Sequence, residues 1–139
     1  MLSTTPSNTA LKWIDAYNRH NIDQLIALYD EHATNVQLPW EKLIQGQEAI
    51  RLTYTNTFNA FPDIHIEAEN LIEQGQWITL EWIFSGTMKG PFAGHAPNNN
   101  AFNMRGCEVF KIVNEKILQQ HGYWDKSTLL KQLKLDWEL

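Results

Sequence analysis

Apolar residues recur at helical spacing in the first half of the chain. Between residues 7 and 19, Leu11, Ile14 and Tyr17 fall on one stripe of a helix. Asn21, a residue type favoured at helix caps, begins a second and shorter segment of the same kind. These segments predict a pair of helices, each with one face to bury.

A short strand and a third helix complete the first half. Residues 33–40 predict a strand that Pro39 stops. Gly46 opens a third segment with helical spacing, and Pro62 prevents that helix from continuing.

From Asp63 onward the apolar period is two, which is typical of strands. Turns are predicted at Gln74–Gly75 and at Asn114–Glu115. We therefore expect two β-hairpins and a closing helix, at residues 63–86, 101–125 and 126–135. Helices followed by a long antiparallel sheet predict one α+β domain over residues 1–139.

The second hairpin brings polar residues to one face. With a two-residue turn, Glu108 lies opposite His121 and Met104 lies opposite Asp125, and Tyr123 shares their face. This face is apolar near the turn and polar at its far end, as the lining of a pocket would be. A register error of one residue would move the whole set to the other side of the sheet.

The opposite face of this hairpin carries Val109, Leu118, Gln120 and Trp124. If the first face lines a pocket, the apolar side chains Val109, Leu118 and Trp124 need another cover. A two-fold homodimer would supply it.

Composition narrows the function classes. A chain of 139 residues fits one domain, and 43% hydrophobic residues favour a folded globule. The net charge is −5 and the Lys and Arg residues are scattered, so we expect no nucleic-acid and no membrane partner. The single cysteine, Cys107, excludes an internal disulfide, and the start of the chain lacks a secretory signal. We expect a soluble, unprocessed protein of the cytoplasm.

Cofactor motifs are absent from the sequence. It contains no HExxH, no glycine-rich phosphate loop and no nucleophile elbow. Acidic and histidine residues alternate along 63–69, but such a row is more typical of a solvated strand face than of a metal site. We expect no metal and no cofactor.

Several stretches together resemble one family. They are FPDIHIEAENLI, the loop GPFAG at 90–94 and the ending KILQQHGYWDKSTLLKQL. Over roughly residues 8–135 the chain resembles the SnoaL-like polyketide cyclases, within the wider group of nuclear transport factor 2 and ketosteroid isomerase. The resemblance implies a cone-shaped domain in which a curved antiparallel sheet wraps around helices and encloses an apolar cavity, commonly in homodimers.

The resemblance also implies site residues. In such cyclases an aspartate on the last strand moves a proton during aldol ring closure, and Asp125 matches that position. His121 falls where relatives often carry a histidine. The chain departs from the family pattern at Met88 and at residues 98–100, where relatives often have a histidine and a Pro-Thr-Gly turn.

The predicted site combines the pairing of the second hairpin with the family resemblance. Asp125 and His121 are the expected catalytic residues, because a carboxylate in an apolar cavity has a raised pKa and can exchange protons near neutral pH. His121 and Tyr123 could donate hydrogen bonds to an enolate. The expected ligand-binding residues are Tyr17, Trp82, Met104, Glu108 and Tyr123.

Each assignment has a structural alternative. Asp125 precedes the last helix and could simply cap it. His121 and Glu108 could form a cross-strand pair, and Tyr123 could be a core residue.

Two functions remain open on the sequence alone. The leading one is a cofactor-independent enzyme that cyclises or isomerises a small apolar carbonyl compound by proton transfer. The alternative is a non-catalytic domain that binds a small apolar ligand or a partner. The two differ in whether a titratable group lies inside the cavity.

Overall fold

A computed structural model describes residues 5–136 of the chain. The helices are α1 (Pro6–Asn18), α2 (Ile22–Ala27), the 3₁₀ turn η1 (Leu38–Trp40), α3 (Gln47–Ala60) and α4 (Lys126–Gln132). The strands are β1 (Tyr29–Gln37), β2 (Lys42–Gln45), β3 (His65–Gln74), β4 (Trp77–Thr87), β5 (Ala101–Val113) and β6 (Lys116–Trp124).

The strands form one six-stranded sheet in the order β2-β1-β6-β5-β4-β3. Its neighbours are antiparallel except β1 and β6, which run parallel. The predicted α+β class with a curved, mainly antiparallel sheet is confirmed, and the parallel pairing of β1 with β6 was not predicted. The sheet remains open, with β2 and β3 at its edges.

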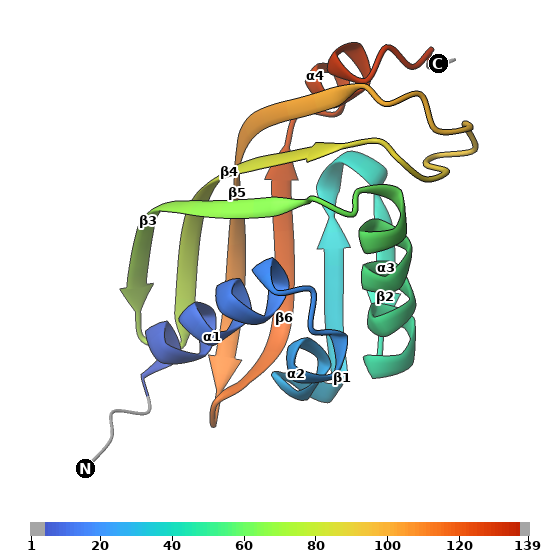
Figure 1. The fold of residues 1–139 in the computed structure, drawn as a ribbon. Helices are drawn as coiled ribbons and strands as arrows, with labels where there is room; N and C mark the ends of the chain where they lie inside the picture. Colours follow the sequence, from blue (N-terminus) through green and yellow to red (C-terminus); the bar gives the residue numbers. More distant parts are fainter. Residues whose placement is uncertain (1–4, 137–139) are drawn as a thin grey trace.

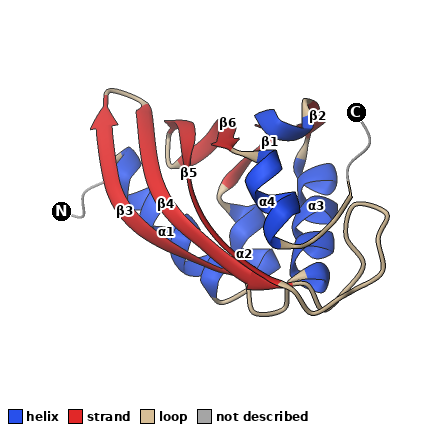
Figure 2. Ribbon diagram, turned by 90° about the horizontal axis from the view of Figure 1, so that it is seen from above, coloured by secondary structure: helices blue, strands red, loops and turns tan. Residues whose placement is uncertain are grey.

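The sheet curves around the helices. Figure 1 shows α1 lying across the concave side of the sheet, and the view from above in Figure 2 shows β3 and β4 bending past the helices. Helix α1 packs on β3, β4 and β5, while α3 covers β1 and β2. The core fills the space between them. Within residues 5–136, no helix combines the length and the apolar character needed to cross a membrane.

The helix signals place each helix start to within one residue of its observed position, whereas α4 ends at Gln132, three residues before the predicted end at residue 135. Asn21 caps α2, and its side chain accepts a hydrogen bond from the Gln24 amide at 3.1 Å. Gly46 precedes α3 with a φ of 89°, a value that glycine adopts without strain. Helix α3 ends at Ala60, before Pro62 as predicted.

Three strand details were not predicted. Strand β1 begins at Tyr29 rather than at residue 33, and the edge strand β2 has too few residues to show a period. Gln74 pairs with Trp77, so the first hairpin turns at Gly75 and Gln76 rather than one residue earlier.

The second hairpin turns at the predicted residues but changes register within β6. Asn114 and Glu115 both adopt positive φ, and Val113 pairs with Lys116. Beyond the pair of Ile112 with Ile117, a β-bulge at Leu118 adds one residue to β6. Every later pair is shifted by one.

The bulge reverses which β6 residues face inward. Glu108 lies opposite Gly122, while His121 lies opposite Val109 on the convex side. The predicted pairing of Glu108 with His121 is therefore wrong. Trp124 and Gln120, expected outside, lie on the concave side with Glu108.

Candidate active site

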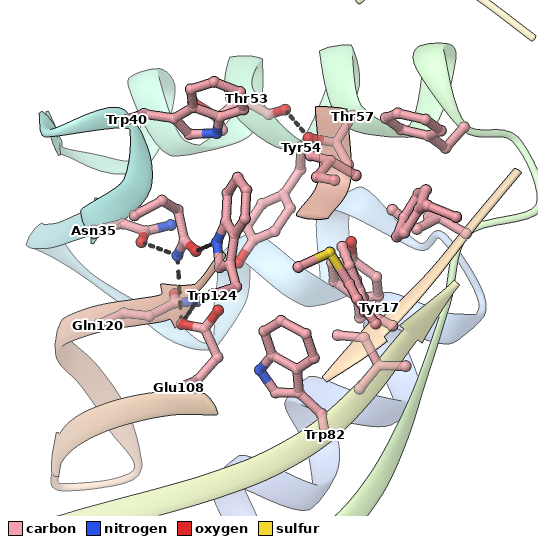
Figure 3. A pocket seen from close by; sticks show the side chains of 18 of the residues that line it. Tyr17, Asn35, Trp40, Thr53, Tyr54, Thr57, Trp82, Glu108, Gln120 and Trp124 are labelled. Carbon is pink, nitrogen blue, oxygen red and sulfur yellow. Dashed lines mark hydrogen bonds between the residues drawn. The ribbon is translucent and has the colours of Figure 1, made fainter. Parts of the chain in front are cut away.

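A cavity of about 150 Å³ opens between the concave side of the sheet and the helices. Its walls are mainly aromatic and aliphatic, as in most small-molecule sites (Figure 3). The lining residues are Trp13, Tyr17, Asn35, Gln37, Trp40, Thr53, Tyr54, Thr57, Phe61, Ile64, Ile66, Trp82, Phe84, Phe92, Phe102, Met104, Glu108, Gln120, Trp124 and Leu129.

Glu108 is the one carboxylic acid among these lining residues, and none of them is Lys, Arg or His. It projects from β5 and is only 5% exposed. A carboxylate removed from water without a cation nearby is costly, so neutral hydrogen-bond donors have to hold it.

Gly122 makes room for the first of these donors. It lies between Gln37 of β1 and Glu108 of β5 in the sheet. A Cβ atom on residue 122 would come within 1.9 Å of Gln37 Oε1. The Gln37 side chain thus crosses over Gly122 to reach Glu108.

The orientation of the Gln37 amide follows from its neighbours. Trp124 Nε1, which can only donate, lies 2.9 Å from Gln37 Oε1. The NH₂ group of Gln37 therefore points the other way, to Asn35 Oδ1 at 2.9 Å and to Glu108 Oε2 at 3.4 Å (Figure 3).

A second chain of hydrogen bonds fixes Gln120. Trp13 Nε1 donates to the hydroxyls of Tyr29 and Tyr54, at 3.0 and 3.1 Å, and these hydroxyls also bond to each other. The Tyr29 hydroxyl donates to Gln120 Oε1. Gln120 Nε2 is then left to donate to Glu108 Oε2, at 3.1 Å.

Both amides thus donate to the same oxygen of Glu108. Oε2 accepts two hydrogen bonds, and Oε1 accepts none from the residues that the structure describes. When Glu108 is neutral, its proton is therefore carried by Oε1. The indole N–H groups of Trp124 and Trp13 lie at opposite ends of the network. Because they can only donate, they fix the direction in which each amide donates toward Glu108.

Burial raises the pKa of Glu108 from its ordinary value of 4.5 to about 7. The hydrogen bonds from Gln120 and Gln37 favour the carboxylate and oppose this rise. Because burial is the larger effect, Glu108 exchanges a proton near neutral pH, as a general acid or base must.

Four of the five expected ligand-binding residues line the cavity: Tyr17, Trp82, Met104 and Glu108. Tyr123, the fifth, does not. It lies on the convex side and is 48% exposed, because the bulge moved it there.

The two expected catalytic residues also lie outside the cavity. His121 is on the convex side, opposite Val109. Asp125 caps α4, where its Oδ2 accepts hydrogen bonds from the Thr128 hydroxyl and amide. Those bonds, led by the one from the hydroxyl, lower the pKa of Asp125. Of its two sequence interpretations, the geometry favours the cap.

The sequence reasoning missed the groups that hold Glu108. Gln37 was treated as part of a short strand, and Gln120 and Trp124 were placed on the wrong face. A bulge at Leu118 leaves no pattern in a run that reads ILQQHGYW, so no signal could have corrected the register. Glu108 itself was found, but as a binding residue.

Trp82 has a buried donor without a partner. Its side chain is 3% exposed, and its Nε1 has no hydrogen-bond partner among the described residues. Such a group costs free energy until it meets an acceptor. The described residues contain no cluster of three or more His, Cys, Asp or Glu suited to a metal ion.

Comparison with known proteins supplies a family and a fold. The model of the SnoaL-like polyketide cyclase family matches residues 8–133. No curated protein matches the chain.

Solved structures with the same fold are distant in sequence. A candidate SnoaL-like polyketide cyclase from Jannaschia sp. CCS1 is 15% identical, with a TM-score of 0.85 over 94% of this chain and 92% of its own. IdmH, a candidate polyketide cyclase from Streptomyces antibioticus, is 20% identical, with a TM-score of 0.80 over 94% and 99%. A protein from Catenulispora acidiphila with a ketosteroid isomerase-like fold, solved with trimethylamine, is 23% identical, with a TM-score of 0.81 over 97% and 99%. At these identities the likeness establishes the fold.

The raised pKa of Glu108 predicts how stability depends on pH. Between pH 4.5 and about 7 the folded state keeps a proton on Glu108 that the unfolded state has lost. The free energy of unfolding should therefore fall by about 3 kcal/mol as the pH rises through this window, and change no further above it. Urea denaturation of the wild type and of Glu108→Gln should show this fall as the difference between the two proteins. Parallel pH profiles would contradict the assignment.

The cap at Asp125 predicts that two substitutions of this residue have different effects on stability. Asp125→Ala should lower the melting temperature by about 3 °C, because the Thr128 amide loses its acceptor, while Asp125→Asn should keep most of the stability. Thermal unfolding followed by circular dichroism measures both. An equal loss in the two variants would show that the charge of Asp125 matters more than its hydrogen bonds.

Proposed function

The chain belongs to the SnoaL-like polyketide cyclase family, and from this we propose that it catalyses proton transfer on an apolar carbonyl compound held in its cavity. The reaction class is aldol cyclisation or isomerisation, and the proposal uses no cofactor. One observation carries it: Glu108 is a buried carboxylic acid inside the cavity whose pKa lies near 7.

Glu108 Oε1 is the proposed proton carrier. As a carboxylate it takes a proton from the carbon next to the substrate carbonyl, and the electrons of the C–H bond move into the enolate. Gln37 and Gln120 stay bonded to Oε2 throughout, so Oε1 keeps its direction. The proton then returns to another carbon in an isomerisation, or to the new alkoxide when the enolate carbon attacks a second carbonyl.

Trp82 is the proposed donor to the substrate oxygen. Its Nε1 has no hydrogen-bond partner within residues 5–136, and its position on β4 is a diagonal neighbour of Glu108 on the same face of the sheet. An enolate oxygen would give this N–H an acceptor as charge develops, which is when a fixed donor helps most. Trp82 takes the place that the sequence analysis had given to His121 and Tyr123.

Proton exchange in D₂O tests the proposal without knowledge of the natural substrate. Cyclohexanone has exchangeable protons beside its carbonyl, and proton NMR follows their replacement by deuterium. The wild-type protein should accelerate this exchange, with a rate that rises through about pH 7 as Glu108 ionises. Glu108→Gln should be slower by about 100-fold.

Asp125→Asn is the matched control, since Asp125 lies outside the cavity. It should keep the wild-type exchange rate. Bound cyclohexanone without accelerated exchange would favour the alternative function, a domain that binds a small apolar ligand.

We further propose a homodimer, in the cytoplasm, that covers the convex face of the sheet. Tyr123 is 48% exposed there, and Val109 and Leu118 of the same hairpin are half-buried. Association through this face would remove their apolar surface from water. Cytoplasmic placement fits the single, unpaired Cys107.

Sedimentation velocity at micromolar concentration should show a dimer, and Tyr123→Arg should weaken it. Leu52→Arg is the control, because Leu52 is 61% exposed on α3, away from the convex face. A monomeric wild type would contradict the dimer.

A further inference from the structure

The cavity around Glu108 continues into a larger and more open groove. The inner cavity measures about 150 Å³ and the outer groove about 720 Å³. Six residues line both spaces and mark the passage between them: Asn35, Gln37, Trp40, Thr53, Thr57 and Phe92. A ligand that reaches Glu108 from this side therefore passes from the groove into the cavity.

The inner cavity has the size of a single ring. An apolar protein cavity of about 150 Å³ holds one benzene molecule. Glu108 lines the inner cavity and not the groove, so the part of a substrate that exchanges a proton has to fit inside that volume.

The walls have little room to recede. Trp82 packs on Phe84 with ring centroids 5.1 Å apart, and Phe84 packs on Phe102 at 5.5 Å. Behind Trp82 lies Gly106, where even a Cβ atom would come within 2.3 Å of the indole ring. Close-packed aromatic walls of this kind do not yield to a second ring without loss of their contacts.

The groove combines apolar and polar walls. Ile44, Pro91 and Ala93 make part of it apolar. Lys42, Asn56 and Asn59, all exposed, add to the polar residues of the passage. Polar or hydroxylated groups can keep hydrogen bonds there while an apolar ring occupies the cavity.

We propose that the substrate is a single-ring carbonyl compound with a polar tail: the ring enters the cavity, and the tail lies in the groove. This rests on the proposed function for the role of Glu108. A fused polycyclic ketone, by contrast, would be too wide to bring its reacting carbon to Glu108.

Methionine labelling reads the occupancy of the cavity directly. The chain has three methionines. Met104 lines the cavity, whereas Met88 is fully buried and does not. In protein labelled with ¹³C at the methionine methyl groups, a ligand in the cavity should shift the Met104 signal and leave the Met88 signal in place.

Three probes test the size limit in the wild type. They are cyclohexanone, the fused two-ring ketone 2-decalone, and 4-(3-hydroxypropyl)cyclohexanone, which adds a polar tail. A larger apolar ligand binds more tightly when space allows, so steric rejection is visible as an inversion: 2-decalone should bind at least about 10-fold more weakly than cyclohexanone. The tailed ketone should bind at least as tightly as cyclohexanone.

Two variants test whether the aromatic wall of the cavity causes the size limit. Phe84→Ala enlarges the cavity and should strengthen 2-decalone binding by about 10-fold or more. Ile83→Ala, one residue away on the opposite face of β4, should change nothing. If Phe84→Ala does not fold, the comparison of 2-decalone with cyclohexanone in the wild type still tests the size limit.

Equal or tighter binding of 2-decalone by the wild type would overturn the single-ring inference, and so would a Met104 signal that none of the probes shifts. Weaker binding of the tailed ketone would overturn the role of the groove. Failure of the proposed function is a separate outcome: the size preference would persist while exchange is the same in the wild type and in Glu108→Gln. The protein would then be a size-selective binding domain.

Discussion

The burial of the Glu108 carboxyl, with no Lys, Arg or His among the described residues that line its cavity, is the constraint on which the site depends. Transfer of an isolated carboxylate out of water costs several kcal/mol, and this chain offsets part of that cost with two amide donors. The balance leaves the pKa near 7. A nearby Lys or Arg would lower the pKa of Glu108 and keep it an anion at neutral pH.

The fold places the two amide donors that offset the burial of Glu108. Gly122 leaves the space through which Gln37 crosses the sheet, and the parallel pairing of β1 with β6 brings Gln37 beside Gly122. Trp124 and Trp13 then orient the two amides from opposite ends. The convergence of both donors on one oxygen thus depends on β1, β5, β6 and α1 together. Glu108 is the one carboxylic acid among the side chains that these elements contribute to the network.

How much of the fold and of the site the sequence predicts depends on whether the sequence signal is local. Periodicity and capping residues located the helices, and the positive-φ turn at Asn114–Glu115 located the second hairpin, because these signals are local. The family resemblance predicted the fold and the cavity. Strand pairing is not local: one extra residue at Leu118 moved His121 and Tyr123 outside and brought Gln120 and Trp124 inside. The resemblance likewise pointed to Asp125, whose place at the N-terminus of α4 makes it a cap.

The central claim is that Glu108 titrates near neutral pH inside the folded protein. Carboxyl ¹³C NMR of protein labelled at the glutamate side chains measures this directly, with Glu108→Gln to assign the signal. The account predicts that the signal missing from the variant titrates with a midpoint of about 7. A midpoint for that signal near the ordinary 4.5 would contradict it, since Glu108 would then be a permanent anion in the cavity at neutral pH.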